Sequence, residues 1–441
     1  MKIITSDEFD SCWKSGAGLA DDLQAENAAR EIIAAVRAEG DAAVRKYAEQ
    51  FDKSSPHRLE IPMEEAKNAL NDLRITNPAL TGALELAADH IRRFSARQRE
   101  QFADFEYEMA DGLVTGQRII PVCRSAIYIP GGRFPLFSSV LMCMIPAFCA
   151  GVEEVIFASP PMEDGLPDRK ILAAAAIAAK VSGISNSGRL RLFAMGGAQA
   201  IAALALGTES VPRVDVIAGP GNKYVAAAKR LLFGEVGIDF IAGPTDVLII
   251  TDNASPRSAE IIAADMVAQA EHDPDARARV LAPNREMADW IASALDRQLA
   301  ALQTQQTALA SLDSGGLIIV YQSREEAIRI ANTIAPEHLE LQAADADAWI
   351  PHLKNYGSLF IGPLSAEVLG DYSAGINHTL PTSTSARFTG GLSVRHFLKT
   401  VTTLRCSPGN GFEKALHAAE ILARAEGLAG HAQSAAIRIV P

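Results

Sequence analysis

Four stretches of the sequence hold side chains that can move a proton or bind a metal ion. In the segment Ile334-Ala335-Pro336-Glu337-His338-Leu339-Glu340-Leu341, the Glu337 carboxylate stands directly beside the His338 imidazole. Two groups of different basicity in one short segment suit general acid and base work. We predict that this pair is the acid/base centre of an enzyme and that a loop carries it. Two ordinary polar residues of a loop would look the same.

The other three stretches contain candidate metal ligands. Gln269 and His272 are three residues apart near the predicted end of a helix, so they share a face. An amide oxygen and an imidazole nitrogen can bind one metal, but glutamine is an uncommon zinc ligand and a surface pair is the simpler interpretation. Asp371 lies in a glycine-punctuated loop, where aspartate also caps turns. Glu426 and His431 end the last predicted helix, where each alone would be an ordinary solvated residue.

Three glycine-containing turns follow predicted strands: Pro130-Gly131-Gly132, Gly196-Gly197 and Gly219-Pro220-Gly221-Asn222. At the carboxyl ends of parallel strands, the N–H groups that begin the next helix attract anions, which suits a ligand with phosphates. Neither a GxGxxG fingerprint nor a GxxxxGK[ST] loop occurs, so the two standard nucleotide motifs give no support. Alternatively, these glycines only allow tight turns between strand and helix.

Bulk properties narrow the class of protein. A chain of 441 residues predicts two or three domains, and 48% hydrophobic with 21% charged residues is typical of globular proteins. A net charge of −12 argues against a general nucleic-acid or anionic-membrane binder. The first residues contain no apolar core of signal-peptide length, and five scattered cysteines form no CxxC pair. We therefore expect a cytoplasmic protein.

Strands alternate with helices from residue 126 onwards, which predicts an α/β fold with two doubly wound domains. We expect a helical region at 1–125 that packs with the second α/β domain, a first domain at 126–245, a second at 246–392 and a tail at 393–441. The expected strands are 126–129, 154–158, 190–194 and 214–218 in the first domain, and 246–250, 278–282, 316–320 and 358–361 in the second.

The tail differs from the rest of the chain. It contains one predicted helix, 413–427, and a short apolar strand, 436–440. One helix and one strand cannot bury their own apolar side chains, so this segment must dock on its own subunit or on a partner.

Taken together, these stretches resemble the histidinol dehydrogenase family over nearly the whole chain. The resemblance implies two Rossmann-like, aldehyde-dehydrogenase-like domains. It is carried by Tyr128-Ile129-Pro130-Gly131-Gly132, Gly196-Gly197-Ala198-Gln199-Ala200-Ile201, Gly219-Pro220-Gly221-Asn222, Ala242-Gly243-Pro244, Gln269-Ala270-Glu271-His272, Ala335-Pro336-Glu337-His338-Leu339, Gly370-Asp371-Tyr372 and Glu426…His431.

The family oxidises L-histidinol to L-histidine through the aldehyde, with two NAD⁺ and a zinc ion. The resemblance implies that His338 takes the hydroxyl proton, because an imidazole pKa lies close to the working pH. Glu337 would activate the water that adds to the aldehyde. In the family the last zinc ligand comes from the tail of the other subunit of a homodimer. The implied zinc ligands are Gln269, His272, Asp371 and His431.

The resemblance also implies binding residues. Tyr128, Gln199 and Asn222 would contact NAD⁺, at the edges of the glycine turns. Thr245 and Glu426 would help bind the substrate. The four zinc ligands and His338 would also contact it.

Two departures leave the substrate open. The family usually has serine where this chain has Thr245, whose methyl group narrows the pocket. Residues 133–135, Arg-Phe-Pro, are bulkier than expected. Relatives that oxidise other small polar alcohols, including sulfonated diols, share such a loop and a run like residues 377–382. A dehydrogenase of another small alcohol is therefore the alternative.

Overall fold

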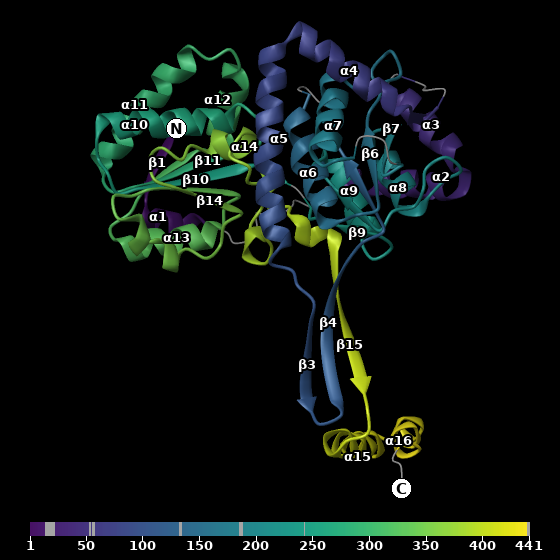
Figure 1. Ribbon diagram of the computed structural model, residues 1–441. Coiled ribbons are helices and arrows are strands. Elements are labelled where there is room, and N and C mark those ends of the chain that lie inside the picture. The colour runs from purple at the N-terminus through teal and green to yellow at the C-terminus, as the bar shows by residue number, and fades with distance from the viewer. Residues whose placement is uncertain are drawn as a thin grey trace.

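A computed structural model describes residues 1–13, 23–52, 54, 58–131, 135–184, 188–241 and 243–438. Two α/β domains lie side by side, and a long arm leaves them and carries two helices at its far end (Figure 1). The predicted α/β fold class is confirmed. None of the helices in the described ranges is both long and apolar enough to cross a membrane.

The first domain is a six-stranded sheet with helices on both faces. Its strand order is β2-β7-β6-β5-β8-β9, and all pairs are parallel except β2 with β7. Each face has its own apolar core. The strands are β2 Glu60–Ile61, β5 Arg124–Tyr128, β6 Glu154–Ser159, β7 Leu190–Ala194, β8 Val216–Ala218 and β9 Gly237–Ile238. One face carries α4 Met63–Thr76, α5 Pro78–Arg99, α6 Phe137–Ala150 and α7 Arg169–Val181; the other carries α2 Leu23–Glu39, α3 Asp41–Phe51, α8 Gly197–Leu206 and α9 Lys223–Leu232.

The N-terminal helices belong to this first domain, which corrects the expectation that region 1–125 packs with the second. Helices α4 and α5 lie against α6 and α7, while α2 and α3 lie against α8 and α9. The apolar sides of these four helices complete the two cores that α6, α7, α8 and α9 only partly cover. Among the described residues of the first 60, β1, α1 and the adjoining Trp13 belong to the second domain.

The second domain is a parallel six-stranded sheet with the order β1-β12-β11-β10-β13-β14. Helices α10, α11 and α12 cover one face, and α1 and α13 cover the other. The strands are β1 Lys2–Thr5, β10 Asp246–Thr251, β11 Arg277–Ala282, β12 Leu317–Val320, β13 His338–Gln342 and β14 Ser358–Ile361. The helices are α1 Ser6–Cys12, α10 Pro256–Ala270, α11 Arg285–Ala300, α12 Gln305–Gly315, α13 Arg324–Ile334 and the short α14 Glu367–Tyr372.

The loop predicted for Glu337 and His338 is only partly present. Helix α13 ends at Ile334, and the left-handed conformation of the next residue, Ala335 (φ 50°), turns the chain at once towards the sheet. Glu337 lies in the bend that follows, and His338 is the first residue of the buried strand β13. The prediction was wrong for His338. Strand β13 contains His338 and Glu340, and titratable side chains are unusual in a buried parallel strand, so the sequence did not indicate a strand here.

After α14 the chain returns to the first domain. Asn377 Nδ2 donates to the Met142 carbonyl of α6 (2.6 Å), and His378 Nε2 lies 2.9 Å from Ser139 Oγ on the same helix. Leu392, Val394 and Phe397 then enter the core on that face of the first sheet. This segment therefore joins the two domains.

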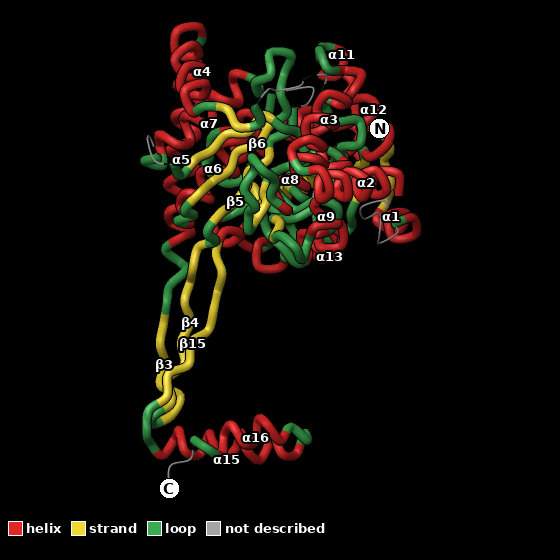
Figure 2. Tube along the Cα trace, turned by 90° about the vertical axis from the view of Figure 1, so that its right-hand side faces the viewer, coloured by secondary structure: helices red, strands yellow, loops and turns green. Residues whose placement is uncertain are grey.

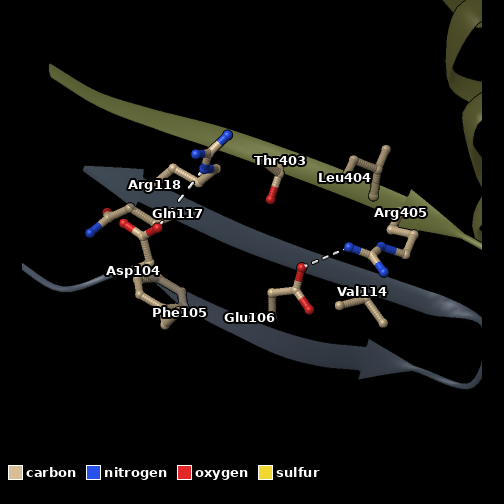
Figure 3. A pocket seen from close by; sticks show the side chains of 9 residues that line it. All are labelled: Asp104, Phe105, Glu106, Val114, Gln117, Arg118, Thr403, Leu404 and Arg405. Carbon is tan, nitrogen blue, oxygen red and sulfur yellow. Dashed lines mark hydrogen bonds and ion pairs between the residues drawn. The ribbon is translucent and has the colours of Figure 1, made fainter. Parts of the chain in front are cut away.

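The arm is a three-stranded antiparallel sheet with the order β15-β4-β3 (Figure 2). It comprises β3 Phe105–Ala110, β4 Leu113–Pro121 and β15 Leu398–Cys406. Strand β15 pairs with β4 over nine residues. A hollow of about 700 Å³ on the arm is lined by Phe105 and Leu404 together with the ion pairs Arg405–Glu106 and Arg118–Asp104 (Figure 3). None of these strands was predicted.

The arm ends in α15 Asn410–Ala425 and α16 Ala429–Ala436. Among their residues only Ala423, Ala432 and Ala435 are buried, while Ile421 and Leu422 are about two-thirds exposed. The predicted final strand was wrong at Ala436, which lies in α16; residues 439 and 440 fall outside the described ranges. The two helices leave an apolar surface uncovered.

A buried ion pair holds the turn after β8. Gly219 has φ 120°, and a Cβ there would lie 2.0 Å from the Tyr128 carbonyl oxygen, so only glycine fits. Lys229 Nζ donates to the Gly219 carbonyl (3.1 Å), and Asp239 Oδ2 accepts from the Gly219 N–H (2.8 Å). Lys229 and Asp239 also pair with each other inside the protein.

We expect Lys229→Met to lower the free energy of unfolding by about 3–5 kcal/mol, because it leaves the Asp239 carboxylate buried without its cation. The double variant Lys229→Met/Asp239→Asn should recover part of the loss, since asparagine still accepts from Gly219. Urea unfolding of the three proteins measures both effects. A loss below about 1 kcal/mol for Lys229→Met, the size expected of an exposed pair, contradicts the assignment.

Candidate functional site

Two opposed sheet edges form the site. The glycine turns follow the carboxyl ends of β5, β7 and β8, whereas Thr245 and Glu337 precede the amino ends of β10 and β13. A cleft of about 660 Å³ opens between these edges. Its lining includes Gly221 and Asn222 from the first domain and Gly243, Pro244 and Arg277 from the second.

Glu337 is fixed by the strand that lies beside it. Parallel pairing sets Val247 opposite His338, so Asp246 and Thr245 lie next to Glu337. Glu337 Oε2 accepts from the Thr245 hydroxyl (2.5 Å) and from the Asp246 N–H (3.1 Å). The Glu337 N–H donates in return to Asp246 Oδ1 (3.2 Å), and Asp246 pairs with the buried Arg279. With Oε2 engaged by two donors, Oε1 is the oxygen that can act on a ligand.

His338 lies between two carboxylates. Its Nε2 is 3.6 Å from Glu337 Oε1, and its Nδ1 is 3.3 Å from Glu367 Oε1. The ring stacks on Phe360, with the ring centroids 5.9 Å apart. Burial disfavours the charged ring, but Glu367 and Glu337 outweigh it and raise the pKa of His338 to about 10. We expected from the sequence a pKa of His338 close to the working pH. That expectation does not hold while the carboxylates of Glu337 and Glu367 are both ionised.

Gln269 is buried in the last turn of α10 and faces this cluster. Its amide nitrogen donates to Glu367 Oε1 (2.8 Å), and its oxygen accepts from the Asp246 N–H (2.9 Å). The amide also contacts the Thr245 hydroxyl at 2.8 Å. Gln269 thus connects the residues around Glu337 with those around His338.

The residues fit a metal ion. His272 Nε2 and Asp371 Oδ2 are 4.0 Å apart, and His338, Glu367 and Asp371 offer ligand atoms within 4.8 Å of one another. Nitrogen and carboxylate oxygen donors at such spacing suit Zn²⁺. His272 is half-exposed, so one side of this group is open to a further ligand.

Glu367 was not predicted from the sequence. Burial raises the pKa of its carboxyl well above the ordinary value, and Oε2 has no hydrogen-bond partner among the described residues. Its signal was its spacing from Asp371, because residues four apart on a helix share a face. Both lie on α14.

The three predicted cofactor residues differ in exposure. Tyr128 and Gln199 are almost fully buried, and the Tyr128 hydroxyl accepts from the Gly197 N–H (3.0 Å). Asn222 is exposed in the cleft and caps α9 through the N–H groups of Tyr224 and Val225. Residues 132–134, which include the bulky Arg-Phe part of the loop, lie outside the described ranges. The predicted contacts with NAD⁺ stay predictions.

Glu426 and His431 do not join the centre of their own chain. Glu426 caps the end of α15 and His431 lies on α16, both exposed at the far end of the arm (Figure 2). The structure therefore brings together Glu337, His338, Thr245 and Gln269, with His272 and Asp371 beside them. It leaves the two tail residues apart.

Comparison with known proteins covers the whole architecture. A family model described as histidinol dehydrogenase matches residues 18–439. The chain is 45% identical over 423 residues to histidinol dehydrogenase of Thermus thermophilus, covering 96% of each chain. It is 43% identical over 412 residues to that of Pseudomonas syringae pv. tomato, covering 93% of this chain and 88% of the relative.

Solved structures agree with this similarity. The crystal structure of histidinol dehydrogenase from Elizabethkingia anophelis superposes with a TM-score of 0.88 at 33% identity, covering 99% of this chain and 97% of that one. An NAD-dependent aldehyde dehydrogenase from Sinorhizobium meliloti gives a TM-score of 0.51 at 13% identity, covering 87% and 88%. The latter likeness concerns the fold alone.

Proposed function

The chain belongs to the histidinol dehydrogenase family of NAD-dependent oxidoreductases, and we propose that it oxidises L-histidinol to L-histidine through the aldehyde, with zinc at the site. The observation that carries the proposal is the position of His338. One ring nitrogen faces Glu337 and the other faces Glu367, and the candidate metal ligands His272 and Asp371 lie beside them. The proposed base, the proposed water-activating carboxylate and the candidate metal ligands therefore lie close together, with His272 on the half-exposed side of the group.

In the first oxidation, His338 removes the hydroxyl proton through Nε2 while hydride passes to NAD⁺. Its Nδ1 lies 3.3 Å from Glu367 Oε1 but makes no hydrogen bond among the described residues, so Glu367 acts on the ring through its charge and supports the positive charge that the ring gains. Phe360 holds the ring plane from one side. The position of Nε2 is therefore set by contacts on the remainder of the ring.

In the second oxidation, Glu337 removes a proton from the water that adds to the aldehyde. Its Oε2 is held by Thr245 and Asp246, so Oε1 is free to accept that proton. As the water adds, His338 returns its proton to the carbonyl oxygen, which completes the hydrate and leaves the ring neutral. The hydrate then loses its second hydride to another NAD⁺, and His338 again takes a hydroxyl proton. The carboxylate and the imidazole divide the proton transfers between the two steps.

Zinc would be held by His272, Asp371 and, after its amide turns, Gln269, together with His431 of another subunit. When bound, it supplies a positive charge that orients the substrate and favours loss of the hydroxyl proton. Asp371 is one of the carboxylates that raise the pKa of His338. Neutralising Asp371 lowers that pKa towards the range in which the ring acts as a base.

We also infer that the chain acts as a homodimer in which each tail serves the other subunit's site. The arm carries His431 and Glu426 away from their own centre, and its helices leave Ile421 and Leu422 uncovered. Leu428 and Ile437 add to that exposed apolar surface. A second copy offers both the missing apolar contact and a site that lacks these two residues, where Glu426 would bind substrate.

The run at residues 377–382 does not favour another substrate. Asn377 is engaged by the Met142 carbonyl, and Thr382 Oγ1 accepts from the Gly243 N–H (2.5 Å). These side chains fasten the segment that joins the domains. We propose histidinol as the substrate on the similarity to histidinol dehydrogenases, and the run itself gives no support to the alternative alcohol.

The zinc-loaded protein should form two NADH per histidinol consumed, a chelator should abolish this activity, and added zinc should restore it. Absorbance at the NADH band measures the reaction, and histidine formation gives the stoichiometry. A panel of other small polar alcohols, including a sulfonated diol, provides the comparison. Faster turnover of one of these, with little turnover of histidinol, contradicts the assignment of substrate.

We expect His338→Asn to lose turnover but to keep its metal, because this ring is assigned to proton transfer. His272→Asn and Asp371→Asn should lose both turnover and metal. Metal analysis after dialysis separates the two classes, and Arg285→Gln, an exposed residue of α11, serves as a control that keeps both. Loss of metal from His338→Asn at the level of Asp371→Asn would mean that His338 is a ligand.

Tail exchange can be tested by mixing two inactive variants, His338→Asn and His431→Asn. After co-refolding, a mixed dimer contains one site with both defects and one intact site. Random pairing at equal amounts then restores about a quarter of the wild-type activity. If each tail served its own subunit, the mixture would stay inactive.

A further inference from the structure

One face of the central strand β13 is polar although it is buried. His338, Glu340 and Gln342 alternate along this face and are all less than a tenth exposed. Leu339 and Leu341 point to the opposite face and belong to an apolar core. Parallel strands covered on both faces normally carry apolar side chains on both, so this row needs an explanation.

Glu340 and Asp265 of α10 are neighbouring carboxyl groups that share one hydrogen-bond donor. The Gln342 amide donates to both, at 2.9 Å to Glu340 Oε2 and 3.3 Å to Asp265 Oδ2. Two neighbouring carboxylates repel each other, which favours one of them keeping a proton. Burial raises the pKa of Glu340 to about 8 and that of Asp265 to about 6, which is consistent with a retained proton.

The other oxygen of Glu340 reaches the site. Glu340 Oε1 accepts from the backbone N–H of Glu367 (3.1 Å), the first residue of α14. Ala366, which precedes α14, has no side chain that could accept a hydrogen bond from the first N–H groups of the helix. Glu340 accepts the hydrogen bond from the Glu367 N–H in its place. Helix α14 presents Glu367 to His338 Nδ1 and Asp371 to His272. Hydrogen bonds thus extend from Asp265 through Gln342 and Glu340 to the start of α14.

We propose that Asp265 and Glu340 are positioning residues, which, linked through Gln342, fix the first turn of α14 and so hold Glu367 against His338. Neither touches the reacting atoms. Their effect on turnover rests on the proposed function, whereas their effect on α14 does not. The buried polar side chains of β13 then serve to position the proposed base, His338, through Glu367 and α14.

The test compares variants that keep the acceptor with variants that remove it. Glu340→Leu removes the carboxyl acceptor but keeps a side chain of similar size. Asp265→Ala removes the second carboxyl group, which is less buried than Glu340. Glu340→Gln and Asp265→Asn keep a hydrogen-bonding side chain at each position. Amide hydrogen exchange of residues 366–373 and kcat for histidinol are measured for each, with metal content as a further readout.

We expect faster exchange in 366–373 and a kcat about tenfold to a hundredfold lower for Glu340→Leu and Asp265→Ala, the range found for groups that orient a site. Glu340→Gln and Asp265→Asn should stay close to wild type in both. Leu341→Ala is the matched control on the same strand. It should lower the urea midpoint but leave kcat per folded molecule unchanged.

Two results overturn the proposal: unchanged exchange in both disruptive variants, or a loss of kcat in Leu341→Ala as large as in Glu340→Leu. If Glu340→Leu does not fold, Asp265→Ala against Asp265→Asn decides the question. A wild-type protein that does not oxidise histidinol refutes the proposed function instead. The exchange measurement still tests the support of α14 in that case.

Discussion

The register between β10 and β13 is the constraint on which the site depends. Because Val247 lies opposite His338, the residues just before both strands are neighbours, and Glu337 receives hydrogen bonds from Thr245 and Asp246. A shift of one residue would turn His338 to the other face of the sheet, among leucines, and take Glu337 from its donors. Backbone pairing in the core of the second domain thereby sets the geometry of proton transfer at its edge.

The two domains contribute opposite sheet edges. The first offers glycine turns at the carboxyl ends of its strands, as open α/β sheets do for anionic ligands. The second offers the amino ends of β10 and β13 and the C-terminal turn of α10. Side chains, not free helix N–H groups, dominate there, which suits proton transfer and metal binding. The segment after α14, bound to α6 through Asn377 and His378, connects the two edges.

Prediction from the sequence succeeded where the local pattern determines the structure. Apolar runs between glycine turns located the strands around residues 126–218 and 246–361, and the spacing of Gln269 and His272 placed both near the end of α10. It failed where tertiary contacts decide. Strand β13 carries Glu340 and is stabilised by Asp265 and Gln342, which no local pattern reveals. Strand β3 alternates apolar and acidic residues over Phe105–Met109, a local signal that was missed, whereas β15 has no regular alternation. Glu367 owes its position to Glu340, and His431 to the arm.

The arm also sets a fixed distance between the two domains and the terminal helices. Strands β15 and β4 are paired antiparallel over nine residues, so the arm resists bending far more than a single-chain linker would. Each residue adds about 3.4 Å, and removing one cross-strand pair from all three strands would shorten the reach by that amount and turn the terminal helices over. The distance between α16 and the two domains can therefore change only in steps of one residue length.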